Sequence, residues 1–149
     1  MSGDRSSFVV FRVGSLELGV PAHEVVELAR LGALTPVPLA PSHIRGVLAH
    51  GGRALPVVRL DTLCGLPASR GDDDLRLVVV SAGGMTVGLE AHRLLGVVEV
   101  ADADLRPVEV TASPGLRQLA TGELHRATGV VVLLDVATLV EAARPRDRA

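Results

Sequence analysis

Cys64 is the residue of this chain best suited to nucleophilic catalysis, because a thiolate attacks electrophilic carbon once a neighbouring base has taken its proton. His43 and His50 precede it, and Asp61 lies three residues before it in the sequence. These are the residue types of a cysteine–histidine–acid catalytic set. Leucines stand within two positions on either side of Cys64, so the sequence favours a buried, unreactive cysteine over a nucleophile.

Two pairs of titratable residues recur at matching places along the chain. His23 and His92 each follow an apolar segment, but no Cys-x-x-Cys or His-x-x-x-His motif accompanies them. Asp61 and Asp135 each follow an apolar run and precede a predicted helix, where an N-cap role explains an acid. The sequence also lacks lysine and the Gly-x-Ser-x-Gly and His-Glu-x-x-His motifs. We therefore expect no enzyme activity, no cofactor and no metal.

Composition excludes several classes of partner. The chain has 149 residues and 48% hydrophobic content, which suits one compact domain or two small lobes sharing a core. A formal net charge of −2, from 15 basic and 17 acidic residues, gives nucleic acid or an anionic membrane no electrostatic attraction. Phe8 and Phe11 are the only aromatic residues, so the sequence offers no stacking platform for bases.

The cysteine count and the first residues bear on location. A single cysteine cannot form an internal disulfide, so nothing requires an oxidising compartment. The apolar run near the start is too short for a signal peptide or a membrane span. We expect a cytoplasmic protein without direct membrane insertion.

The elements that must position these residues are mostly strands joined by glycine turns. Gly14-Ser15 separates the apolar segments 8–13 and 16–20, and Gly83-Gly84 separates 77–82 and 85–89, each with the spacing of a two-residue hairpin. Gly51-Gly52 also predicts a hairpin turn that needs positive φ. Many short strands with glycine and proline turns favour small barrels over a βαβ sheet.

Helices are fewer. Pro21 predicts the first turn of a short amphipathic helix that carries Val25, Val26 and Leu28. Segment 94–100 favours a strand, 101–106 a loop, and a short turn of helix is expected after Pro114. A last helix is expected over 136–144. Segment 66–74 combines proline, glycine and three aspartates, and we place a boundary between lobes there.

The two halves of the chain share the order of their parts, which predicts a tandem pair of small β units. The matched pairs are Gly19 with Gly88, Pro36-Val37 with Pro107-Val108, Gly46 with Gly122, and Asp61 with Asp135.

Five segments together resemble the CheW-like domain, the adaptor of bacterial chemosensory arrays. They are FVVFRVGSLELGVP with VVEL after it, TPVPLAPSHIRGVL, ALPVVRLDTLCGLP, VVVSAGGMTVGLEAHRLLGVVEV and VVVLLDVATLV. The resemblance implies a mainly all-β fold of two five-stranded SH3-like β-barrel lobes, with short helices between strands and at the C-terminus. It covers one domain, 8–143, with lobes 8–66 and 75–143, exchange of strands between them left open, and flexible tails 1–7 and 144–149.

The resemblance also implies a non-catalytic scaffold that couples the cytoplasmic tip of methyl-accepting receptors to the regulatory domain of a CheA-type histidine kinase. Receptor arrays would then bring the protein close to the membrane through its partners. The partner-binding residues implied are Val25, Glu27, Gly46, Val47, His50, Gly51, Gly52 and Arg59.

Three places in the chain depart from the family pattern. Where the family has an Asn-Leu-Arg-Gly turn, this chain has Ala49-His50-Gly51-Gly52, so glycine replaces an arginine able to make paired hydrogen bonds. Arg59 and His92 each stand where the family has an acid. Two alternatives stay open: a divergent CheW-like protein of a motility or developmental pathway that has lost the usual receptor contact, and a small-molecule-binding β-barrel.

Overall fold

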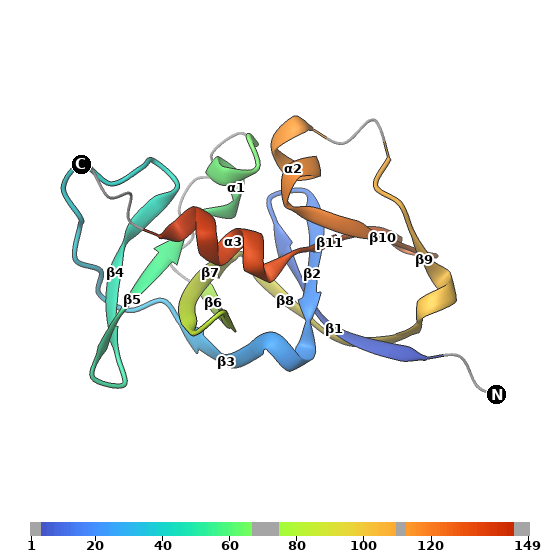
Figure 1. Cartoon of the computed structure of the whole chain (residues 1–149), viewed down its shortest axis with the longest axis horizontal. Helices are drawn as coiled ribbons and strands as arrows, with labels where there is room; N and C mark the ends of the chain where they lie inside the picture. Colours follow the sequence, from blue (N-terminus) through green and yellow to red (C-terminus); the bar gives the residue numbers. More distant parts are fainter. Residues whose placement is uncertain (1–3, 67–74, 110–112, 145–149) are drawn as a thin grey trace.

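Two β-sheets lie side by side in the computed structural model, which describes residues 4–66, 75–109 and 113–144 (Figure 1). The first sheet has six strands in the order β8-β1-β2-β11-β10-β9, and the second has five in the order β3-β6-β7-β5-β4. The mainly β fold class is therefore confirmed, and the first sheet gains its sixth strand from the two-residue β9. The expected boundary segment 66–74 lies outside the described residues, except for Leu66.

The strands are β1 (Arg5–Val13), β2 (Leu16–Pro21), β3 (Val25–Arg30), β4 (Ile44–His50), β5 (Arg53–Val58), β6 (Arg76–Ala82), β7 (Met85–Ala91), β8 (Arg93–Ala101), β9 (Leu105–Arg106), β10 (Ala120–Arg126) and β11 (Gly129–Leu134). The helical segments are η1 (Ala22–Glu24), α1 (Leu60–Leu63), η2 (Asp102–Asp104), α2 (Pro114–Leu119) and α3 (Val136–Ala143). In the part of the chain that the structure describes, no helix is long and apolar enough to cross a membrane.

The predicted hairpin turns are all present. Val13 pairs with Leu16, His50 with Arg53, and Ala82 with Met85, so two residues close each hairpin. Both glycines of the Gly51-Gly52 and Gly83-Gly84 turns have positive φ, between 56° and 79°. A two-residue turn whose twist matches the flanking strands requires this conformation, which glycine adopts without steric cost.

The two halves of the chain exchange strands. The hairpin β1-β2 lies in the same sheet as β8–β11, whereas β6-β7 lies with β3–β5. The chain crosses to the second sheet after β2 and returns after β7, so β3 pairs with β6 and β8 pairs with β1. Lobes drawn at 8–66 and 75–143 therefore do not coincide with the two sheets, because each half of the chain contributes to both.

Matching irregularities show that the two sheets are built alike. A one-residue bulge occurs in the crossing strands at Val26 of β3 and Leu95 of β8. A second pair of bulges falls at Arg45 of β4 and Thr121 of β10. A bulge adds a residue to one strand and re-aims its side chain. Repetition of both bulges supports the tandem β units expected from the sequence.

Gly46 and Gly122 occupy equivalent positions just after these second bulges. A Cβ atom on Gly46 would lie 2.7 Å from the carbonyl oxygen of Thr35, and one on Gly122 would lie 2.8 Å from that of Arg106. In both sheets a backbone segment passes over the strand at this point, Thr35 bridging to β4 and β9 pairing with β10. The glycines are present because a side chain would collide with that backbone.

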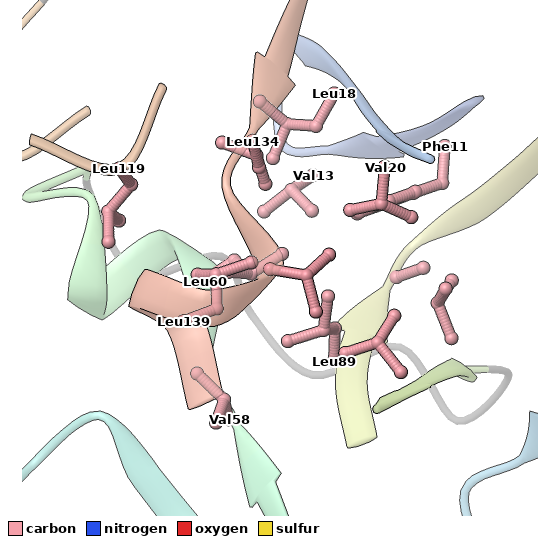
Figure 2. Close-up of a cluster of buried hydrophobic side chains, with 14 of the residues drawn as sticks. Phe11, Val13, Leu18, Val20, Val58, Leu60, Leu89, Leu119, Leu134 and Leu139 are labelled. Atoms are coloured by element: carbon pink, nitrogen blue, oxygen red, sulfur yellow. The ribbon is translucent and has the colours of Figure 1, made fainter. Parts of the chain in front are cut away.

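Three clusters of buried apolar side chains fill the fold. A strand whose successive residues are all apolar contributes to two of these clusters, one on each of its faces. On β1, Phe8 and Val10 belong to a cluster within the first sheet, whereas Val9 and Phe11 belong to the large cluster between the sheets. Leu55, Val57, Leu77 and Val79 form the third cluster, within the second sheet. Figure 2 shows the central cluster, where Leu139 of α3 meets Leu60 and residues of both sheets. Alternation of side chains explains why these strands are apolar throughout.

Several local expectations need correction. Segment 25–30 is the strand β3, not a helix, because its residues pair with β6 after one 3-10 turn, and β-branched valines favour a strand. Strand β1 begins at Arg5, so residues 5–7 of the expected N-terminal tail are strand. The expected loop 101–106 contains η2 and β9. The short helix after Pro114 and the last helix, over 136–143, are confirmed.

Candidate partner-binding surfaces

The crossing strand β3 carries an exposed apolar pair, Val26 and Leu28, whose exposed fractions are 61% and 48%. Val26 is the bulge residue of β3, so the bulge turns an apolar side chain outward instead of into the core. We call this pair the β3 surface. The sequence prediction missed it, because placing these residues on a helix assigned them to a buried face.

Strand β8 carries an equivalent apolar pair, Leu95 and Val97, with exposed fractions of 37% and 66%. Leu95 is the bulge residue of β8, and strand pairing makes Leu95 equivalent to Val26 and Val97 equivalent to Leu28. We call this pair the β8 surface. Both strands stand at an end of their sheet, so each surface adjoins a strand edge. Exposed apolar residues beside a strand edge are typical of protein docking sites.

Glu27 and His50, two of the predicted partner-binding residues, are in contact. Glu27 Oε2 lies 2.6 Å from His50 Nε2, and both side chains are partly exposed. Val25 begins the same strand, and Gly51 and Gly52 form the exposed turn that follows His50. The structure thus brings five of the eight predicted residues to one end of the second sheet.

The other three predicted residues lie elsewhere in the second sheet. Gly46 is buried beneath the Thr35 backbone, which gives it a packing role. Val47 lines a hollow of about 870 Å³ together with residues of segment 37–44 and the end of α3. Leu39 in that segment is 92% exposed and has a φ of 63°, a conformation that non-glycine residues seldom adopt.

Arg59 occupies the N-cap position of α1, where its side chain caps no backbone N–H group. Its guanidinium Nη2 lies 3.6 Å from Oδ2 of Asp61, which is buried. Asp61 itself is inside the helix and accepts a hydrogen bond from the Thr62 backbone N–H at 2.7 Å. The expected N-cap role is therefore wrong for Asp61, whereas Asp135 does cap α3, accepting from the Ala137 N–H at 3.2 Å.

The catalytic candidate Cys64 is fully buried. Burial, with the nearby carboxylate of Asp61 as the smaller cause, raises the pKa of the thiol to about 11. A protonated thiol is not a nucleophile at neutral pH. Nε2 of His43 contacts the Ala142 carbonyl at 2.8 Å, and Nε2 of His50 contacts Glu27. The prediction that Cys64 is a small buried hydrophobic residue is confirmed.

One group of metal-ligating side chains was not anticipated from the sequence. Glu109, Glu123 and His125 place one ligand atom each within 4.8 Å of one another. The Glu109 backbone N–H donates to Glu123 Oε2 at 3.0 Å and lowers the pKa of the Glu123 carboxyl; His125 acts in the same direction, and burial opposes both. In the described ranges no comparable group includes His23 or His92, and His92 Nδ1 accepts a hydrogen bond from the Gly14 N–H at 2.7 Å.

The fold and these surfaces define the chain as a protein-interaction module. Its strand-exchanged sheets have filled interiors, and two exposed apolar pairs lie beside strand edges. Its one thiol is buried, and the raised pKa keeps that thiol protonated. Comparison with known proteins agrees. The family model described as CheW-like domain matches residues 7–144. The chain belongs to this family, whose members are non-catalytic scaffolds of chemosensory signalling, and the prediction that it is not an enzyme is confirmed.

Three individual relatives illustrate the similarity. The chain is 35% identical over 142 residues to Protein FrzA of Myxococcus xanthus, covering 93% of this chain and 88% of that protein. It is 28% identical to Chemotaxis protein CheW of Rhizobium meliloti, covering 86% of this chain and 83% of the relative. Among solved structures, scaffolding protein TtCheW from Thermoanaerobacter tengcongensis matches with a TM-score of 0.81 at 20% identity, over 89% of this chain and 86% of that one.

Proposed function

We propose that this chain is a cytoplasmic adaptor that couples the tip of a methyl-accepting receptor to the regulatory domain of a CheA-type histidine kinase. The observation that carries the proposal is the pair of equivalent β3 and β8 surfaces, because an adaptor must hold two partners at once. The adaptor acts only by holding its two partners in a fixed relative position.

The β3 surface suits the receptor. It lies beside the Glu27–His50 contact and the Gly51-Gly52 turn, the residues that family resemblance assigns to partner binding. A polar pair beside an exposed apolar pair supplies a helical partner with both an anchor and a polar rim. The β8 surface lacks that pair, since Gly96 is equivalent to Glu27.

The β8 surface suits the kinase regulatory domain. Its two exposed residues adjoin an edge strand, and a β-rich partner can pack its own strand edge or turn against such a surface. Contacts of this size are modest in area, which fits an array in which many weak links hold each component.

The test exchanges apolar for charged residues at exposed positions, where a substitution has the least effect on folding. The paired variants are Val26→Glu with Leu28→Glu, and Leu95→Glu with Val97→Glu. Binding of each to a receptor-tip fragment and to the kinase regulatory domain is measured by calorimetry. The proposal expects the first variant to lose receptor and keep kinase, and the second to do the reverse. Loss of neither partner, or of both partners in each variant, would contradict it.

A second candidate is an adaptor of a pathway other than chemotaxis. It is favoured by the absence of the turn arginine and by the 35% identity to Protein FrzA, which exceeds the 28% identity to the Rhizobium meliloti CheW protein. The same calorimetry separates the candidates when the wild-type chain is used. Binding to kinase without binding to a chemotaxis receptor tip supports the second candidate, and binding to neither overturns both. A small-molecule barrel is disfavoured, because valine and leucine side chains occupy the interior of each sheet.

A further inference from the structure

We propose that Glu109, Glu123 and His125 form a zinc-binding site at the outer edge of the first sheet. The three side chains come from two neighbouring segments, the stretch that follows β9 and the strand β10. Residues 123 and 125 are two apart on a strand, so their side chains point to the same face. The site therefore rests on strand geometry and on the pairing of β9 with β10.

The donor set fits zinc. Two carboxylates and one imidazole are common ligands of a tetrahedral zinc ion, which leaves a fourth position for water or a partner's side chain. Bonds of about 2.0–2.2 Å place tetrahedral ligand atoms roughly 3.3–3.6 Å apart. His125 Nε2 already lies 2.9 Å from Glu123 Oε1, and all three ligand atoms lie within 4.8 Å of one another. Binding thus requires shifts that the exposed Glu109 and His125 side chains can make.

The charge balance of Glu123 is the second observation. Three carboxylic acids are buried in the described part of the chain: Asp61, Glu90 and Glu123. The first two face Arg59 and Arg45, which carry a permanent positive charge. Glu123 faces a backbone N–H group and the imidazole of His125, which is a cation only when it is protonated. A buried carboxylate is stable when a cation balances it, and a zinc ion held between Glu123 and His125 would be that cation.

The equivalent place in the second sheet has no such donors. Because Gly122 is equivalent to Gly46, Glu123 corresponds to Val47 and His125 to Ala49. The repeat from which both sheets are built therefore does not require acids or histidine here. The donor set is particular to the first sheet, and zinc would clamp the segment after β9 onto β10.

The experiment titrates zinc chloride into the full-length, tag-free, metal-stripped protein by calorimetry. One equivalent of saturable binding is expected, with a rise in the thermal unfolding midpoint that tracks zinc concentration. Magnesium should give no comparable signal, because it prefers octahedral oxygen ligands. Cobalt substitution should give the visible absorption of a tetrahedral site.

The test variants are Glu109→Gln and His125→Asn, both at exposed side chains. Each is expected to weaken zinc binding by at least about tenfold, as loss of a ligand does, and to abolish the rise in unfolding midpoint. His50→Asn is the matched control: it also belongs to a Glu–His pair, but no third donor joins that pair among the residues the structure describes, and zinc binding should be unchanged. No saturable binding by the wild type, or unchanged binding by the Glu109→Gln, His125→Asn double variant, would overturn the site.

Discussion

Glu27 Oε2 and His50 Nε2 lie 2.6 Å apart, although their strands β3 and β4 are the two outermost strands of the second sheet. Neighbouring strands are about 4.8 Å apart, so the outer strands of a flat five-stranded sheet would be separated by about 19 Å. The contact therefore shows that the sheet curls far enough for side chains of its two outer strands to touch, which gives a partial closure like that of a small barrel. The Gly51-Gly52 turn follows His50 directly, and a side chain added there would project beside this closure.

Gly51→Arg should strengthen binding to a receptor-tip fragment if the closure faces a receptor. Nothing lies within 4 Å of a Cβ placed on Gly51, so the arginine has room, and its guanidinium can make paired hydrogen bonds to an acid. Its φ of 56° costs a non-glycine residue roughly 1–2 kcal/mol of folding stability. Calorimetry and urea unfolding measure the two effects. Gly51→Ala carries the same backbone cost without the charge, and equal affinity of both variants would refute the orientation.

Gly46→Ala and Gly122→Ala should destabilise the protein by similar amounts, about 1–3 kcal/mol each, because each new methyl group would meet a backbone carbonyl at under 3 Å. The free energy of unfolding in urea measures the loss. Gly32→Ala is the matched control: its nearest neighbour is a Leu48 methyl group at 3.4 Å, and a change within about 0.5 kcal/mol is expected. Loss at one glycine without the other would show that the two sheets are not equivalent here.

Arg59→Asn should leave the protein about 0.5–1 kcal/mol more stable than Arg59→Ala, because both variants lose the ion pair with the buried Asp61 but only asparagine can cap the first N–H groups of α1, as Asp135 caps those of α3. Arg59→Ala provides the comparison, since it also removes the contact with Asp61 but adds no cap. Urea unfolding of both variants separates the two contributions. If the asparagine and alanine variants were equally stable, α1 would have no need of a cap.

Cys64 should react slowly with a thiol-specific disulfide reagent at pH 8 in the folded protein and rapidly in urea. A pKa raised from the ordinary 9.0 to about 11 lowers the thiolate fraction roughly a hundredfold, and burial blocks access as well. Comparable rates in buffer and in urea would disprove the burial.

The raised pKa of the Cys64 thiol makes the stability of the protein depend on pH. Because the folded-state pKa of Cys64 is above the unfolded value, its contribution to stability is complete below about pH 8 and is lost as the pH rises from 9 through 11. Cys64→Ala should remove that alkaline loss and leave partner binding intact. Unfolding measured from pH 7 to pH 11 tests the first point and calorimetry the second. A wild-type curve that matched the variant's would contradict the assignment.

Residues that act through local geometry could be predicted from the sequence. Glycine-containing dipeptides between apolar runs predicted three hairpins, and proline predicted the start of α2, because φ preferences act within a few residues. The burial of Cys64 followed from its leucine neighbours. Segment 25–30 could not be decided in this way: its apolar spacing fits either a short helix or a strand, and pairing with β6 decided for the strand.

The alignment of the two halves shows the same limit. Matching acids placed Asp61 opposite Asp135, but the strand register pairs Val57 with Gly88 and Leu133 with Gly19. This register makes Arg59, not Asp61, the equivalent of Asp135. A two-residue offset keeps the same strand face, so the apolar pattern of the sequence could not reveal it.

The sequence by itself determined the β class, the turns, the apolar strands and, through its motifs, membership of the CheW-like family. Tertiary structure alone decided that the halves exchange strands, that Glu27 meets His50, and that Glu109 joins Glu123 and His125. The physical reason is that turns and burial depend on near neighbours and on apolar composition. Strand partners and side-chain clusters depend instead on which distant segments pair, and in what register.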